Sequence, residues 1–331
     1  MNRLVMHRFL LPVVAAGLAM AAGPISGPVA GFVTDSSRTQ LRTIFGVPGA
    51  YGFSDALPLP DGVSQIRLAP GQQYALVERA NSSAAVLFLE NGAVDRLVPL
   101  DGALATADWV AFSSGAGSAL LFSSSANRLQ VIGGLPDAPR IVANIDAASL
   151  PESPAMGAVS DDGSVILAAS ATALYRVPQT GAAQVVFSAG SIRSVVVLRN
   201  GTDAALSDSA SGAVHLVRNV TSKPEAAVLA SGLDEAGAVY PSSDGLSLFV
   251  AQSKAAGIAS INLASGEVKS FPTAVAAGGL IPLRNRDTFL ISARANQPGW
   301  VFYRDGDGGR VVFVPAATDG ARQIPSKGSA R

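Results

Sequence analysis

One unit of about 40 to 45 residues recurs six times between residues 63 and 315, and it constrains the fold more than any other feature of this sequence. Each copy holds an apolar run, a turn rich in Gly, Asp or Asn, a second apolar run that ends in small polar residues, and two further apolar runs. The clearest copy reads "IRSVVVL", "RNGTD", "AALSDSASG", "AVHLVRN" and "EAAVLAS". Four strands in about 40 to 45 residues is the repeat of a β-propeller blade. The first turns centre near Gly71, Gly115, Gly163, Gly201, Gly245 and Arg286, in steps of 38 to 48 residues.

The apolar runs are typical of strands. "SVVVL", "AVLFL" and "RVVFV" are short, rich in β-branched and aromatic residues, and bounded by turn sequences such as "DDGS" and "NGTD". No segment has a sustained apolar period of 3.6 residues. A β-sandwich is the main rival architecture, but it would have to divide six similar units unevenly between two sheets, whereas a propeller needs only that each blade cover the next. The sequence therefore predicts a single all-β propeller of four-stranded antiparallel blades.

The stretch "GPVAGFVTDSSRTQLRTIFGVPG", residues 27–49, matches the later runs of the first unit. We interpret it as the outer half of a blade whose inner half is missing. Six full units and this half-blade predict seven blades, with the ring closed by N-terminal strands. Two further strands are then needed, either from Tyr51 to Leu59 or from the segment after Val314, and six blades with an added pair is the alternative. Closure by terminal strands would remove an exposed sheet edge.

The first residues have the pattern of a secretory leader. Arg3, His7 and Arg8 precede the apolar run "LLPVVAAGLAMAAG", and small residues at Ala19 and Ala21 predict cleavage after Ala21. An uncleaved anchor is the alternative, although the run is shorter than the ~20 residues of a membrane-spanning helix. We therefore expect a signal peptide over 1–21, export to the periplasm or the extracellular space, a propeller domain over 22–320 and a flexible tail over 321–331.

Composition limits the chemistry. The chain has no cysteine, so disulfides, thiolate metal sites and cysteine nucleophiles are excluded. Loss of Arg3 and Arg8 with the leader takes the formal net charge from 0 to −2, without basic clusters. This charge does not favour nucleic acid. We expect a monomer with no membrane span after cleavage.

Three of the units share a sequence pattern with repeats known from other proteins. "SDDGSVILAASATALYRV", "RNGTDAALSDSASGAVHLV" and "SSDGLSLFVAQSKAAGIASINLASGEV" each place a turn before an apolar run, a small polar turn and a second apolar run. In this they resemble secreted bacterial β-propellers with NHL-like or YVTN-like repeats, with Ser207-Asp208 or Ala251-Gln252 where such repeats often carry an Ala-Asp pair. The resemblance implies the propeller fold and does not by itself imply a function.

Catalytic motifs are scarce. His215 is the only histidine after leader removal, and one histidine cannot form a multi-histidine metal site. "RDGDGG", residues 304–309, begins like a calcium loop but lacks the distal ligands, so we interpret it as a hairpin turn, as we do Asp161 and Asp162 in "SDDGS". We predict no catalytic residue, cofactor or metal. The alternative is a lactonase-like or lyase-like enzyme that holds Ca²⁺ or Mg²⁺ in the central channel with carboxylates and amides from several blades.

With no catalytic motif, the loops on one face of the propeller are the candidate binding surface. The loops joining second and third strands, together with the connections between blades, lie on one face of a propeller, and here they are small, polar and sparsely charged. We therefore predict a non-catalytic binding or scaffolding module for a protein, peptide or glycan partner. The residues predicted to face that partner are Arg79, Asn127, Asp208, Lys254 and Arg294.

Overall fold

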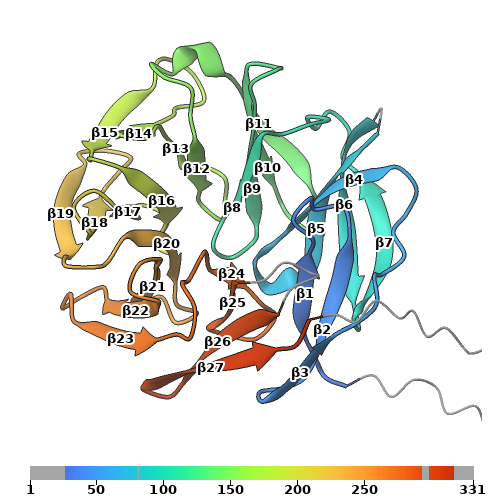
Figure 1. The fold of residues 1–331 in the computed structure, drawn as a ribbon. Helices are drawn as coiled ribbons and strands as arrows, with labels where there is room; N and C mark the ends of the chain where they lie inside the picture. The colour runs from blue at the N-terminus through green and yellow to red at the C-terminus, as the bar shows by residue number, and fades with distance from the viewer. Residues whose placement is uncertain (1–26, 81, 293–297, 317–331) are drawn as a thin grey trace, which may run out of the picture.

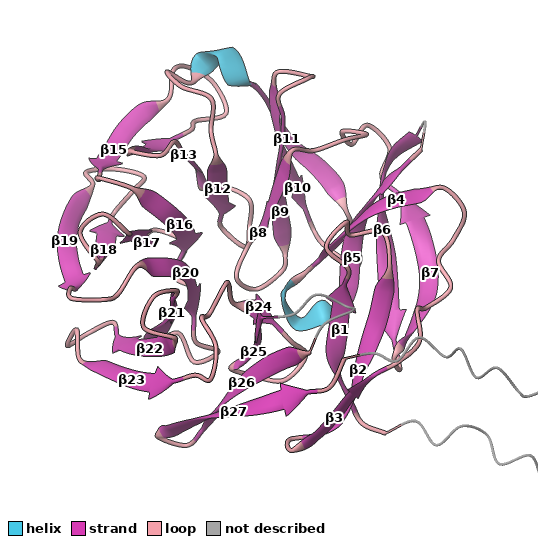
Figure 2. Ribbon diagram, viewed as in Figure 1, coloured by secondary structure: helices cyan, strands magenta, loops and turns pink. Residues whose placement is uncertain are grey.

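The computed structural model describes residues 27–80, 82–292 and 298–316. These residues form 27 strands and two short 3₁₀ helices. The strands make seven antiparallel sheets that stand around a central axis like the blades of a propeller (Figures 1 and 2). The predicted signal peptide and flexible tail lie outside the described residues. Within the described residues, no helix is long and apolar enough to cross a bilayer.

Six of the sheets have four strands each, and the inner strand of each comes first in the chain. Their strands, from the inner strand outward, are β4 (Val63–Leu68), β5 (Tyr74–Arg79), β6 (Ser82–Glu90) and β7 (Ala93–Pro99); β8 (Trp109–Phe112), β9 (Ser118–Ser123), β10 (Arg128–Gly133) and β11 (Arg140–Asp146); β12 (Met156–Val159), β13 (Ile166–Ala169), β14 (Ala173–Arg176) and β15 (Gln184–Ser188); β16 (Ile192–Val197), β17 (Ala204–Asp208), β18 (Ala213–Arg218) and β19 (Glu225–Ala230); β20 (Ala236–Pro241), β21 (Ser247–Gln252), β22 (Gly257–Asn262) and β23 (Val268–Pro272); β24 (Ile281–Pro282), β25 (Thr288–Ser292), β26 (Gly299–Asp305) and β27 (Gly308–Val314). The 3₁₀ helices are η1 (Pro70–Gln72) and η2 (Ala147–Ser149).

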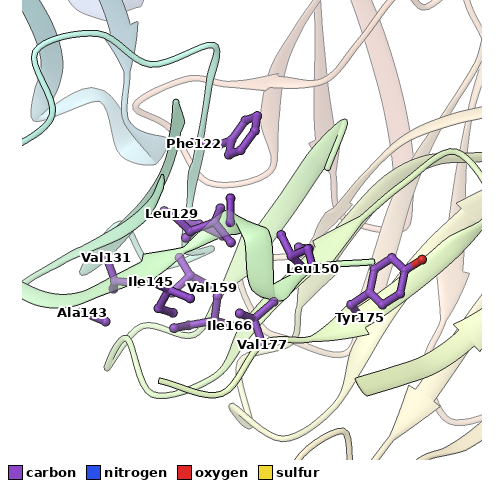
Figure 3. Close-up of a cluster of buried hydrophobic side chains, with 13 residues drawn as sticks. Phe122, Leu129, Val131, Ala143, Ile145, Leu150, Val159, Ile166, Tyr175 and Val177 are labelled. Atoms are coloured by element: carbon purple, nitrogen blue, oxygen red, sulfur yellow. The ribbon is translucent and has the colours of Figure 1, made fainter. Parts of the chain in front are cut away.

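The core lies between neighbouring blades. Figure 3 shows one such layer, in which Leu129 and Ile145 of one sheet meet Val159 and Ile166 of the next, and all four are at most 5% exposed. Middle strands such as β9 and β21 are buried along their whole length because a neighbouring blade covers each of their faces. This explains why the second run of each unit is continuously apolar rather than alternating.

The ring has two faces. We call the upper face the one formed by the turns after the inner strands, for example η1 and the turn at Gly245. The lower face carries the turns between second and third strands and the connections from one blade to the next. The partner surface predicted from the sequence is on this lower face.

The seventh sheet is N-terminal and has three strands in the described residues, β1 (Val29–Thr34), β2 (Leu41–Val47) and β3 (Ala50–Phe53). Two contacts give the direction of β1. Near its start, the Ala30 carbonyl accepts a 3.1 Å bond from Arg284 N–H in the upper-face turn after β24, and after its end the Arg38 carbonyl accepts a 2.8 Å bond from Ile66 N–H, midway along β4. β1 therefore runs from the upper to the lower face, opposite to β4, and corresponds to the second strand of a blade.

This differs in detail from the expected half-blade. The stretch 27–49 does lack an inner strand, but it forms the second and third strands rather than the third and fourth. Tyr51, one end of the expected additional stretch, lies in β3, which supplies the outer strand. The segment after Val314 that was the other candidate lies outside the described residues from 317 onward.

A glutamine side chain replaces part of the missing strand. Phe32 N–H donates to Gln72 Oε1 at 2.6 Å, and Gln72 Nε2 donates to the Phe32 carbonyl at 3.0 Å. Gln72 is fully buried. Gly31 makes room for it, because a Cβ at that position would lie 2.4 Å from Gln72 Oε1.

The N-terminal sheet closes the ring by packing against both neighbours. On one side, Val33 and Ile44 share a buried cluster with Leu290 and Val301 of the last blade. On the other side, Phe32 and Leu41 share a buried cluster with residues of β4–β6. The prediction of a seven-bladed propeller closed by N-terminal strands is thus confirmed.

Candidate functional site: the central channel and its upper mouth

A cavity of about 660 Å³ lies in the channel, against β1 and between β24 and β4. Its walls include Phe32 and Thr34 from β1, Ile66 from β4 and Ile281 from β24. Val110 and Phe112 of β8 and Tyr240 of β20 also line it, so this cavity is the central channel of the ring.

Two of the three charged groups that line this cavity, Asp35 and Arg67, are already engaged. Asp35 accepts bonds from Thr39 N–H at 2.7 Å and Gln40 N–H at 2.8 Å, and it also bonds to Ser37. Burial raises the pKa of Asp35, but these bonds outweigh it, so the pKa lies below its ordinary value. Arg67 donates to the Ala107 carbonyl at 3.0 Å, and burial, with the charge of Arg38, lowers its pKa.

A second cavity, of about 280 Å³, opens at the upper mouth of the channel. Its floor includes Tyr240, whose hydroxyl donates to the Ser114 carbonyl at 3.1 Å and whose ring meets Phe289 edge-on at 5.4 Å. Burial raises the pKa of Tyr240. This floor is therefore rigid, mainly apolar and uncharged at neutral pH.

Three arginines line this upper cavity, and they come from two turns of the upper face: Arg199 follows β16, while Arg284 and Arg286 follow β24. Arg199 and Arg286 are exposed, and Arg284 is half-buried with its guanidinium 5.8 Å from the Phe32 ring centre. None of the three is within ion-pair distance of a carboxylate in the part of the chain that the structure describes. The upper mouth thus has cationic groups without anionic partners among these residues.

The carboxylate in the same cavity, Asp287, is engaged elsewhere. It accepts a 2.7 Å bond from Ser243 N–H, and Arg304 lies 3.7 Å away. Arg304 also approaches Asp244 at 3.6 Å. Asp287 therefore does not neutralise the three arginines.

Four of the five residues predicted to face a partner lie on the lower face, on separate blades. Arg79 ends β5, and its Nε has no hydrogen-bond partner among the described residues. Asn127 donates to Asp146 at 2.9 Å beside a shallow hollow, and Lys254 is exposed in the turn after β21. Within the described ranges no hydrogen bond or ion pair joins any two of these side chains, and Arg294 lies outside those ranges. Their role in binding stays a prediction.

Asp208 is buried and joins two segments of the lower face by hydrogen bonds. It is 4% exposed, and its carboxylate accepts bonds from Ser191 N–H at 2.7 Å and Ser211 Oγ at 2.7 Å, with longer ones from the N–H groups of Gly190 and Ala210. Burial raises its pKa, but these bonds outweigh it and hold the pKa below its ordinary value. The carboxylate thereby fastens a lower-face turn to the connection from the preceding blade.

The upper arginines were not among the residues predicted from the sequence, although a signal was present. "RNGTD" and "RNRD" place an Arg-Asn pair at the same point of two units, directly after the inner strand. Among the described residues, no group of three or more His, Cys, Asp or Glu side chains could hold a metal ion.

Comparisons with known proteins support the fold. No protein-family model and no curated protein sequence matches this chain. Among solved structures, a putative 6-phosphogluconolactonase from Bacteroides uniformis is similar, with 20% identity, a TM-score of 0.52, and coverage of 86% of this chain and 93% of that one. The corresponding protein from Bacteroides fragilis has 15% identity, a TM-score of 0.52, and coverage of 86% and 92%. At such identities the likeness shows a shared β-propeller fold.

Proposed function

We propose that this protein is an exported, monomeric and non-catalytic binding module whose upper channel mouth takes an acidic peptide segment of a partner protein. The observation that carries the proposal is the set of three arginines around the upper cavity, none with a carboxylate partner among the described residues. Guanidinium groups bind carboxylates with two parallel hydrogen bonds, so they are suited to Asp and Glu side chains.

The shape of the cavity supports a peptide segment. Its volume of about 280 Å³ lies just below the range of roughly 300–1,000 Å³ typical of small-molecule pockets, so it can take one or two side chains of a peptide. Pro241, Pro282 and Tyr240 give it an apolar floor, while Arg199 and Arg286 stand exposed at its rim. Apolar stems can pack on this floor while acidic groups reach the rim.

The test is a titration with fluorescein-labelled hexaglutamate, followed by fluorescence anisotropy at low salt, with hexalysine as the opposite-charge probe. We expect hexaglutamate to bind and the triple variant Arg199→Gln, Arg284→Gln, Arg286→Gln to bind at least tenfold more weakly. Binding should weaken as salt rises because exposed charges are screened.

The matched control removes the same charge elsewhere, in the variant Arg128→Gln, Arg140→Gln, Arg193→Gln, whose three side chains are exposed and lie outside the upper cavity. We expect this variant to bind like the parent protein. Equal losses in the two triple variants would show non-specific charge attraction and refute the proposal. Binding of polygalacturonate without binding of hexaglutamate would point to a glycan partner instead.

The alternative function is a metal-dependent propeller enzyme. The two Bacteroides proteins share the fold, and both are named as putative 6-phosphogluconolactonases, so lactone hydrolysis is the reaction to compare. Fold alone does not transfer an activity. The dependence of the melting temperature on Ca²⁺ and Mg²⁺ separates this alternative from the binding module.

A further inference from the structure

The central channel is apolar in its upper part and carries cations in its lower part. Inner strands run from the lower to the upper face, so Leu68, Phe112 and Tyr240, near the ends of β4, β8 and β20, line the upper part. Arg38 and Arg67 line the same cavity. We propose that the channel binds a small carboxylate with an unbranched apolar chain, which lies in the upper part while the carboxylate meets the two arginines.

Both arginines bring their charge to the lower part of the channel. Arg38 lies in the turn after β1, and its carbonyl accepts the 2.8 Å bond from Ile66 N–H, so its backbone is beside the residue that precedes Arg67. The Arg67 side chain reaches down to the Ala107 carbonyl, in the lower-face connection before β8. Burial and then the charge of Arg38 lower the pKa of Arg67, which is a further sign that the two cations are close.

The guanidinium of Arg67 is only partly paired. An arginine has five N–H donors, and among the described residues this one makes a single hydrogen bond, while its buried Nε has no partner. Glu78 lies 3.9 Å from Arg67 Nη2 and accepts a 3.1 Å bond from Ala107 N–H instead. An under-paired buried cation is unfavourable. A ligand carboxylate beside Arg67 would therefore supply an acceptor that the described part of the protein does not.

Asp35, the carboxylate that lines this cavity, holds the turn that presents Arg38. Asp35 accepts bonds from the N–H groups of Thr39 and Gln40, and Arg38 N–H donates to the Asp35 carbonyl at 3.1 Å. Within residues 27–80, no ion pair joins the side chains of Asp35 and Arg38. The oxygens of Asp35 are thus occupied inside the turn, and the guanidinium of Arg38 is left for a ligand.

The upper part of the channel suits an alkyl chain. The cavity volume of about 660 Å³ lies within the range of roughly 300–1,000 Å³ typical of small-molecule sites. Ile66, Val110 and Ile281 add apolar walls, and Ile281 is 42% exposed, so a bound chain would cover apolar surface. The hydroxyl of Tyr240 already donates to Ser114. These walls favour a hydrocarbon chain over a sugar with several hydroxyl groups.

The test compares three probes that share one chain and differ in the head group: decanoate, decanol and decyltrimethylammonium. Each is titrated into the full chain below its micellar concentration and followed by isothermal titration calorimetry. We expect one decanoate to bind per protein, decanol to bind at least tenfold more weakly, and decyltrimethylammonium to bind more weakly still. Absence of decanoate binding, or equal binding of decanoate and decyltrimethylammonium, would overturn the proposal.

Two variants separate the head group from the chain. Arg38 is exposed, so Arg38→Gln should leave the fold intact, weaken decanoate at least tenfold and leave decanol unchanged. Ile281→Trp fills part of the channel and should weaken both probes. The matched control Arg140→Gln removes an exposed charge outside the channel and should bind decanoate like the parent protein. Equal losses in Arg38→Gln and Arg140→Gln would refute a specific head-group site.

The channel site is independent of the acidic-peptide site at the upper mouth. We expect Arg38→Gln to bind hexaglutamate like the parent protein, and the triple variant Arg199→Gln, Arg284→Gln, Arg286→Gln to keep its decanoate binding. Loss of decanoate binding in the triple variant, with normal binding in Arg38→Gln, would place the carboxylate at the upper mouth and overturn the proposed orientation.

Discussion

At the scale of single residues, Gln72 shows how a side chain can act as backbone. Its amide donates one hydrogen bond to Phe32 and accepts another, the two bonds that a neighbouring strand would make. The sequence places Gln72 in the turn "APGQQY" and predicts no special role for it. Nothing local distinguishes it from Gln73, because its partner lies forty positions earlier in the chain.

That neighbour provides a matched comparison. We expect Gln72→Ala to lower the free energy of unfolding by about 1–3 kcal/mol, because it leaves buried peptide groups of Phe32 without partners. Gln73 is exposed, so Gln73→Ala should change stability by less than about 0.5 kcal/mol. Urea unfolding followed by tryptophan fluorescence measures both, and equal effects would refute the role of Gln72.

Asp208 gives a prediction that depends on pH. Because its pKa in the folded protein lies below its ordinary value, its contribution to stability is present above the pKa of an unfolded Asp, about 4, and is lost as the pH falls through the folded value. We expect Asp208→Ala to destabilise the protein by about 1–3 kcal/mol at pH 7, and the difference from the parent to shrink toward pH 3.

The control for this experiment is Asp55→Ala, which removes an exposed carboxylate that accepts no hydrogen bond from another blade among the described residues. Its unfolding free energy should follow that of the parent protein at both pH values. A constant gap between parent and Asp208→Ala from pH 7 to pH 3 would contradict the assignment of charge-dependent bonds to Asp208.

At the scale of elements, the N-terminal strands test how far a pattern can be interpreted. The runs "VAGFVTD" and "LRTIFGV" were correctly predicted as strands of an incomplete blade, but their place within the blade was shifted by one strand. All strands of a blade are short apolar runs between similar turns, so the pattern gives their number better than their rank. Rank depends on contacts with distant segments, such as those of Phe32 with Gln72 and of Ala30 with Arg284.

The same strands carry a stability prediction. A chain that begins at Ala50 lacks β1 and β2 and loses Phe32, Val33, Leu41 and Ile44, each at most 3% exposed. At about 1.5–3 kcal/mol for each buried side chain, the loss is roughly 6–12 kcal/mol, comparable to the whole stability of a typical domain. We expect this chain to melt far below one that begins at Ala22 when both are followed by circular dichroism. Equal melting temperatures would show that β1 and β2 are not part of the ring.

At the scale of the whole molecule, the repeat predicted the ring but not the cavity at its upper mouth. The number of blades follows from repeat spacing, because each unit can bury its apolar faces only against the next. The lower face was favoured because its loops are small and polar. The upper cavity arises because turns from β16 and β24 converge at the mouth of the channel, a closeness that depends on closure of the ring.

The rival enzymatic function has its own whole-molecule test. A resident Ca²⁺ or Mg²⁺ that binds only the folded state raises the melting temperature as its concentration rises. For a binding module we expect the metal-free protein to melt at the same temperature in millimolar Ca²⁺, millimolar Mg²⁺ or EDTA, as measured by differential scanning calorimetry. A rise with either ion, together with stoichiometric binding, would favour the metal-dependent enzyme.

The contact between β1 and the last blade has a consequence for how the ring assembles. Ala30 meets Arg284, so the seam cannot form until nearly all of the chain is available. Contacts between segments so far apart form slowly because a large loop must close first. Joining the two termini by a linker and opening the chain between β3 and β4 should leave the same blades in the same order. Such a circular permutant would begin folding with a complete blade, and its seam would lie between two neighbouring repeats.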